Sequence, residues 1–189
     1  MIKAIIFDCF GVLTTEAWLA FKYAHFGNDP EKMTHATVLN HRFDARLISN
    51  KDFIGGIAEL AGVREQAVSD ALHGTELNEA LLDFIRHGLK PHYKIGMLSN
   101  IGPDWLASMF SNDDLALFDA ITLSYEIGFI KPDPRAYQAA VNRLDVTAEE
   151  CIFIDDQERN VTAAKEQGMY GIVYRNTPQA IAELSKLLN

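Results

Sequence analysis

Cysteine is scarce in this chain, with two in 189 residues. Cys9 follows one predicted strand and Cys151 begins another, so the two would lie at opposite edges of a parallel sheet. We therefore expect no disulfide, and we expect both side chains to be small buried apolar groups in a reducing compartment.

Positive charge and long apolar runs are scarce as well. The chain has 17 lysines and arginines against 26 acidic residues, a net charge of -9, and no basic stripe. This argues against a nucleic-acid partner, because phosphate backbones are held by clustered lysine and arginine. No apolar run approaches the roughly 20 residues that cross a bilayer, and strand residues begin at the N-terminus without a signal-peptide pattern. We expect a cytoplasmic protein with no membrane partner.

The first apolar segment predicts the position of a binding site. Residues 4–7 form a short apolar run that is typical of a strand buried on both faces. Asp8 follows this run, and in parallel sheets ligands bind beyond the carboxyl ends of the strands. Gly11 allows the backbone to turn back toward whatever Asp8 contacts. Aspartate is also a common strand terminator and turn residue, so this segment taken alone is more often structural than functional.

The remaining pattern predicts two parts. Residues 16–75 carry helical patterns without a strand pattern, which indicates an insertion after the first strand. Strands and helices alternate from Lys94 onward, as expected for right-handed βαβ units on a parallel sheet. The predicted fold is α/β, a Rossmann-like parallel five-stranded sheet with helices on both faces. Its core comprises residues 1–15 and 76–189.

Polar residues follow the predicted strands at the edge where Asp8 lies. They are Ser99 and Asn100 after the second strand, Lys131 in the loop after the third, and Asp155 and Asp156 after the fourth. Three neighbouring carboxylates repel one another unless a cation is present, and all-oxygen ligands suit Mg²⁺. An ammonium and a hydroxyl beside such a metal suit a phosphoryl group. Each residue alone has a structural explanation, but their joint occurrence indicates a site.

Four segments together resemble the motifs of the haloacid dehalogenase-like hydrolase superfamily. They are Asp8-x-x-Gly11, Leu98-Ser99-Asn100, Lys131-Pro132-Asp133, and Phe153-Ile154-Asp155-Asp156 with Asn160. The resemblance covers essentially the whole chain, and the insertion of residues 16–75 looks like the small helical cap of that superfamily. It implies a five-stranded Rossmann-like fold and, for most members, a Mg²⁺-dependent phosphatase that forms a phospho-aspartate.

The resemblance also implies roles for individual residues. Asp8 is the implied nucleophile, and its carboxylate and the backbone carbonyl of Phe10 would bind Mg²⁺. Asp156 is implied as a direct metal ligand and Asp155 as a second ligand. Ser99, Asn100 and Lys131 are expected to contact the substrate, with Lys131 also neutralising charge that develops on the phosphoryl oxygens.

One position departs from the pattern of the family phosphatases. The residue two after the nucleophile is usually an aspartate that protonates the leaving group and activates water, but here it is Phe10. A phenyl ring does neither, so general acid-base help of about 10²–10⁴-fold must come from elsewhere or be absent. A phosphatase acting on a sugar 1-phosphate or an acyl phosphate, or one that takes an acid from the cap, is the favoured interpretation. The chain resembles the subgroup of sugar 1-phosphate phosphatases and epoxide hydrolase N-terminal domains.

Two alternatives stay open. A 2-haloacid dehalogenase needs no proton for its halide and has an aromatic residue at this position, but Asp155 and Asp156 would repel the carboxylate of its substrate. A catalytically weak binding or regulatory protein is the other alternative. In each case the partner is a small molecule, and the sequence leaves monomer and homodimer open.

Specificity is expected to come from the predicted cap. Aromatic and guanidinium groups suit sugar faces and anions, so four residues of the cap are candidates for substrate contacts: Trp18, Arg42, Phe43 and Arg46. The six histidines show no ligand spacing, and we expect them to have no part in the site.

Overall fold

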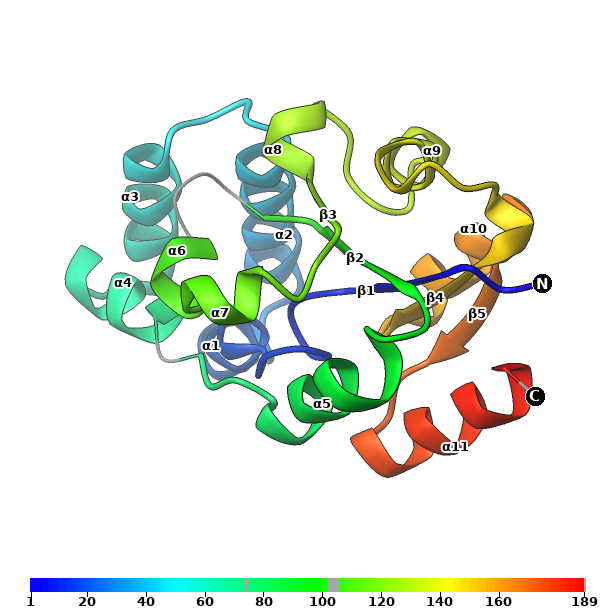
Figure 1. The fold of residues 1–189 in the computed structure, drawn as a ribbon. Coiled ribbons are helices and arrows are strands. Elements are labelled where there is room, and N and C mark those ends of the chain that lie inside the picture. The colour runs from blue at the N-terminus through cyan, green and yellow to red at the C-terminus, as the bar shows by residue number, and fades with distance from the viewer. Residues whose placement is uncertain (74, 102–105, 189) are drawn as a thin grey trace.

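A five-stranded parallel sheet forms the centre of the molecule (Figure 1). The computed structural model describes residues 1–73, 75–101 and 106–188. The strands are β1 (Ala4–Phe7), β2 (Lys94–Ser99), β3 (Ala120–Leu123), β4 (Cys151–Asp155) and β5 (Tyr170–Val173). Their order is β3-β2-β1-β4-β5, and all pairs are parallel. The chain leaves β1 first to one side and later to the other, so β1 marks the switch point where α/β sheets bind ligands. The predicted fold class is confirmed.

Helices cover both faces of the sheet because the side chains of β1 alternate between two cores. Ile5 and Phe7 pack with α5 (Glu79–Phe84) and α11 (Thr177–Leu188). Ala4 and Ile6 pack with α9 (Pro134–Leu144) and α10 (Glu158–Glu166). The four residues of β1 are fully buried, as predicted for a strand in the middle of a covered sheet.

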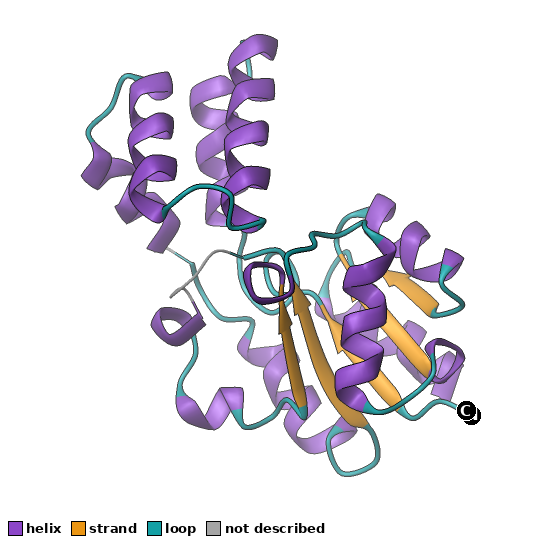
Figure 2. Ribbon diagram, turned by 90° about the horizontal axis from the view of Figure 1, so that it is seen from above, coloured by secondary structure: helices purple, strands orange, loops and turns teal. Residues whose placement is uncertain are grey.

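Four further helices form a separate block that stands away from the sheet layers (Figure 2). They are α1 (Ala17–Phe26), α2 (Pro30–Asp44), α3 (Asn50–Ala61) and α4 (Glu65–His73). Their apolar faces enclose a core of their own, centred on Phe26, Phe53 and Ile57. These four helices are called the helical block. The division of the chain into a core and an insertion of residues 16–75 stays a prediction, and so does the function of the helical block as a cap.

Two short segments join the helical block to the sheet, and they are tied to each other. The amide of Thr15 donates to the carbonyl of Glu76 at 2.8 Å, and the amide of Glu76 donates to Thr15 Oγ1 at 2.9 Å. Thr14 and Leu77 form an isolated antiparallel bridge. The far end of the block is also anchored, since Ser124 Oγ donates to the carbonyl of Asp44 at 2.7 Å. The joint therefore has a defined geometry beside the end of β1.

Several short elements were not predicted. They are α7 (Asn112–Leu115), α8 (Ser124–Ile127), a 3-10 turn at Ala148–Glu150 and a π-helical turn at Ile85–Leu89. Each is too short to show a helical period in sequence. A helix is predicted through Trp105, Met109 and Phe110, and α6 (Leu106–Met109) lies within it. Trp105 lies outside the described residues.

Both cysteines are buried and unpaired, as predicted. In the described part of the chain, no helix is long and apolar enough to cross a membrane.

Candidate active site

Three carboxylates meet at the carboxyl edge of the central strands. Asp8 follows β1, Asp155 ends β4 and Asp156 comes next, and one oxygen from each lies within 4.8 Å of the others. Asp8 and Asp155 are buried, so their charges are poorly screened by water. The convergence expected from a parallel sheet is therefore present.

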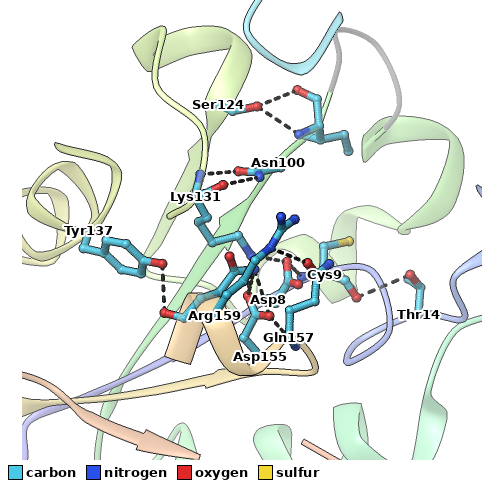
Figure 3. Close-up of polar contacts among 12 residues, drawn as sticks. Asp8, Cys9, Thr14, Asn100, Ser124, Lys131, Tyr137, Asp155, Gln157 and Arg159 are labelled. Atoms are coloured by element: carbon cyan, nitrogen blue, oxygen red, sulfur yellow. Dashed lines mark hydrogen bonds and ion pairs between the residues drawn. The ribbon is translucent and has the colours of Figure 1, made fainter. Parts of the chain in front are cut away.

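Lys131 lies between two of these carboxylates (Figure 3). Its Nζ is 2.6 Å from Asp8 Oδ1 and 2.7 Å from Asp155 Oδ2, and the residue is 2% exposed. Burial acts to lower the pKa of Lys131, but the charges of Asp155 and Asp8 outweigh it and raise that pKa. The pKa of Asp8 is raised well above its usual value by burial and by Asp155, while Lys131 acts to lower it. Lys131 is thus a permanent cation in contact with Asp8.

Asn100 holds the backbone of Lys131 in place. Asn100 Nδ2 donates to the carbonyl of Lys131 at 3.0 Å, and the amide of Lys131 donates to Asn100 Oδ1 at 2.7 Å. These bonds link the end of β2 to the loop before α9, as Figure 3 shows. Asn100 also lines the cavity described below, so its role in substrate binding stays a prediction.

The two aspartates after β4 have different surroundings. Asp155 accepts hydrogen bonds from the amide of Gln157 at 2.8 Å, from Lys131 Nζ, and from Asn160 Nδ2, which is 3.0 Å from each carboxylate oxygen. Asp156 Oδ1 is buried and has no hydrogen-bond partner among the described residues. Burial and the charge of Asp155 raise the pKa of Asp156 to about 6. An orphaned carboxylate oxygen beside two other carboxylates fits a divalent cation, which would supply the missing partner.

Ser99 presents a second orphaned group. Its hydroxyl is fully buried at the end of β2 and has no hydrogen-bond partner in the described part of the chain. The pairing of Phe7 with Met97 places Ser99 alongside Cys9, next to the turn that carries Asp8. Ser99 is not among the residues lining the cavity, and its contact with a phosphoryl oxygen stays a prediction.

Gly11 allows the turn after Asp8 to approach the metal-site carboxylates. Its φ is +79°, and a Cβ at this position would lie 2.6 Å from Asp156 Oδ2. The close approach predicted for Gly11 is therefore to Asp156, because only a residue without a Cβ fits there.

Gly11→Ala is accordingly expected to weaken divalent-cation binding by more than about tenfold, since Asp156 must move away from Asp8. Calorimetric titration with Mg²⁺ measures this change. Gly128→Ala is the matched control, because Gly128 has a φ of +76° but open space around its Cβ position. Both variants should lose about 1 kcal/mol of folding stability from backbone strain. Equal Mg²⁺ affinity in both would contradict the assignment of Asp156 to the cation.

A cavity of about 370 Å³ opens over this edge, between the sheet and the helical block. Asp8, Phe10, Lys131 and Asp156 line its floor. The wall from the helical block includes residues that the sequence analysis did not select: Glu16, Lys22, Asn40, His41 and Asp44. Arg159, on α10, extends into the same cavity (Figure 3).

The predictions for the helical block are only partly matched. Trp18 and Phe43 line the cavity, whereas Arg42 and Arg46 are exposed and are not among its lining residues. His41 lines the cavity, and the prediction that the histidines take no part in the site stays a prediction. His41 reaches the cavity because α2 packs over the sheet edge. The spacing of histidines in the sequence gives no information about this packing.

Comparison with known proteins agrees with this geometry. A family model for haloacid dehalogenase-like hydrolases matches residues 2–168. A D-ribitol-5-phosphate phosphatase of Bacteroides thetaiotaomicron is 27% identical over 208 aligned positions, which cover 100% of both chains.

Two solved structures are similar along nearly their whole length. A predicted hydrolase of this family from Porphyromonas gingivalis has a TM-score of 0.77 at 27% identity, covering 100% of this chain and 98% of that one. A family enzyme from Bacteroides thetaiotaomicron, in complex with magnesium and inorganic phosphate, has a TM-score of 0.73 at 26% identity, covering 93% and 95%. The chain belongs to the haloacid dehalogenase-like hydrolase family.

Proposed function

We propose that this hydrolase is a Mg²⁺-dependent phosphatase that acts on a small phosphate monoester, such as a sugar phosphate, through a phospho-aspartate on Asp8. The observation that carries the proposal is the contact of Asp8 with Lys131 at 2.6 Å beside the orphaned oxygen of Asp156. A nucleophile, a fixed cation and a carboxylate oxygen without a hydrogen-bond partner among the described residues suit phosphoryl transfer with a divalent cation. The phosphatase among the relatives, and the magnesium and phosphate in a similar enzyme, support the proposal.

Asp8, Asp156 and the backbone carbonyl of Phe10 would hold the cation, with Asp155 as an indirect ligand because its oxygens already have protein partners. Bound Mg²⁺ supplies positive charge that offsets the repulsion among the carboxylates and the charge of the phosphoryl group. The orphaned oxygen of Asp156 is the observation that makes this donor set fit.

The residues of this chain divide the reaction between them. An oxygen of Asp8 attacks phosphorus, and the bond from phosphorus to the leaving oxygen breaks. Lys131 neutralises charge on the phosphoryl oxygens from its fixed position, and the free hydroxyl of Ser99 is available to donate to one of them. Water then attacks the phospho-aspartate, and phosphate leaves with Asp8 restored.

The helical block is proposed to act as the cap over this reaction. Its side chains form the cavity wall that faces Asp8, so a leaving group expelled in line from Asp8 enters this space. The hydroxyl group of Thr37 and the amide group of Asn40 suit a hydroxylated leaving group, and the ring of Trp18 suits the face of a sugar.

A substrate panel tests the proposal. Release of phosphate and of halide is measured from sugar phosphates, acyl phosphates, nucleotides and 2-haloacids, each with Mg²⁺ and with EDTA. We expect phosphate release that requires Mg²⁺. Halide release that is indifferent to EDTA would replace the proposal with a dehalogenase, for which Phe10 is the favouring residue. If the folded protein releases neither phosphate nor halide from any of these substrates, the result would favour a binding protein.

A further inference from the structure

The phosphatase reaction needs a proton donor that the usual position does not supply. Phe10 lines the cavity floor where an acid is expected, and its ring exchanges no proton. An alkoxide leaving group must gain a proton, and the water that attacks the phospho-aspartate must lose one. A group in the cavity that carried out both transfers would replace the missing aspartate.

We propose that Glu16, at the joint between the sheet and the helical block, is the general acid and base of this reaction. The inference rests on the proposed phosphatase function and adds a catalytic residue to it. Glu16 lines the same cavity as Asp8, Phe10 and Asp156. It precedes α1 at the N-cap position, yet its side chain makes no capping hydrogen bond, so its carboxyl group is not used to stabilise the helix.

The joint fixes where Glu16 lies. Thr14, two residues earlier, donates its amide to the carbonyl of Cys9 at 3.0 Å, and Thr15 is bonded to Glu76 in both directions. Glu16 is thus attached to the turn that carries Asp8, not to the far end of the helical block. From this position Glu16 lines the cavity beside Asp8 and Phe10.

The surroundings of Glu16 suit proton transfer in both directions. Burial and the charge of Asp156 raise its pKa to about 7, with a further contribution from Asp155, while Lys22 and Lys131 act to lower it. Burial is the largest cause and does not depend on whether Asp156 holds a cation. A carboxyl group with such a pKa is present in both protonation states near neutral pH, as an acid that later serves as a base requires.

Two other titratable groups of the cavity fit the role less well. Asp44 accepts a hydrogen bond from Asn40 Nδ2 at 2.8 Å. Burial raises the pKa of Asp44 to about 7, but Lys131 and Lys22, not the metal-site carboxylates, are the charges that act on it. Burial and the charges of Arg159 and Lys22 lower the pKa of His41, so its ring is neutral at neutral pH. Glu16 is preferred on geometry, because it lies at the joint beside the turn that carries Asp8 and its side chain makes no capping hydrogen bond.

The proton balance closes over one turnover. As the oxygen of Asp8 bonds to phosphorus and the leaving oxygen departs, the Glu16 carboxyl group gives its proton to that oxygen. As water bonds to phosphorus and the bond to Asp8 breaks, the Glu16 carboxylate takes a proton from the water. Phosphate and the alcohol are released, and Glu16 is again protonated.

The test compares the activities of wild type, Glu16→Gln and Asp44→Asn on two substrates. One is p-nitrophenyl phosphate, and the other is an alkyl phosphate that wild type hydrolyses, such as glycerol 3-phosphate. Glu59→Gln is the control, because it removes an exposed carboxylate from the same helical block. For Glu16→Gln we expect a loss of about 10²–10⁴-fold on the alkyl phosphate. With p-nitrophenyl phosphate we expect a retained burst of nitrophenol followed by slow turnover, because the good leaving group needs no acid but hydrolysis lacks its base. Adding Phe10→Asp to Glu16→Gln should restore activity on the alkyl phosphate.

The outcomes separate this inference from the function on which it rests. If folded wild type releases no phosphate even from p-nitrophenyl phosphate, the phosphatase proposal fails and the role of Glu16 fails with it. If wild type is active but Glu16→Gln matches Glu59→Gln, or loses both the burst and the alkyl activity equally, Glu16 is not the acid. A leaving-group-dependent loss in Asp44→Asn instead would transfer the role to Asp44.

Discussion

Replacing Lys131 with methionine is expected to lower phosphate release by at least about 10³-fold, because the fixed charge next to the phosphoryl group disappears. The same change should destabilise the fold by about 3–5 kcal/mol, because Asp8 and Asp155 lose the cation that each contacts in a buried position. Urea unfolding with EDTA present measures the second effect. Mg²⁺ should restore part of the stability and little of the activity.

Lys90→Met is the matched control for this prediction. Lys90 pairs with Asp119 at 2.7 Å, but both side chains are partly exposed. Water screens such a pair, so its loss should cost less than about 1 kcal/mol and leave turnover unchanged. If Lys131→Met unfolds at the same urea concentration as Lys90→Met and retains turnover, the contacts of Lys131 with Asp8 and Asp155 contribute neither to stability nor to activity.

Removal of Mg²⁺ is expected to abolish turnover, and the affinity for Mg²⁺ should depend on pH. In the metal-free protein the pKa of Asp156 is raised to about 6 by burial and by Asp155. Below that pKa the carboxyl group is protonated, so a proton competes with the cation, and Mg²⁺ should bind more weakly at about pH 5 than at about pH 7.5.

Titration calorimetry at the two pH values measures this difference, and Asp156→Asn should remove the part of it that comes from Asp156 while the part from Asp8 remains. Turnover that persists after exhaustive EDTA treatment would contradict the metal requirement. An Mg²⁺ affinity that is the same at both pH values would contradict the role given to Asp156.

Much of the fold follows from local sequence signals. The buried run of β1 lies where the sequence analysis placed it. The capping box from Ser49 to Asp52 and the Asp133 cap before Pro134 are local features of the same kind. Such features are set by neighbouring residues, so a single sequence is sufficient to locate them. The short helices α7 and α8 lack a full helical period and were missed for that reason.

Some features of the site could likewise be predicted from local sequence patterns, and others could not. The grouping of Asp8, Lys131, Asp155 and Asp156 could be predicted, because the ends of parallel strands share one edge. The contacts of Asn100 with the Lys131 backbone join segments that are 31 residues apart, so no local pattern reports them.

Only part of the cavity wall could be predicted, namely Trp18 and Phe43. His41 lines the cavity because α2 packs over this edge of the sheet, which no local pattern reports. One local feature of the sequence could have indicated Glu16 as a candidate. Glu16 follows residues 1–15, the first segment of the predicted core, and so lies close to Asp8 along the chain. The loss of the usual acid at Phe10 made a replacement necessary, but only the structure indicates where it lies.

The central claim is that Asp8 itself receives the phosphoryl group. The most direct measurement is acid quenching of the enzyme during turnover of a radiolabelled phosphate ester, followed by digestion and identification of the labelled peptide. The account predicts label on the peptide that contains Asp8, its release by hydroxylamine, and neither label nor turnover in folded Asp8→Asn. Phosphate release by Asp8→Asn at the rate of wild type, with no label on either protein, would contradict it.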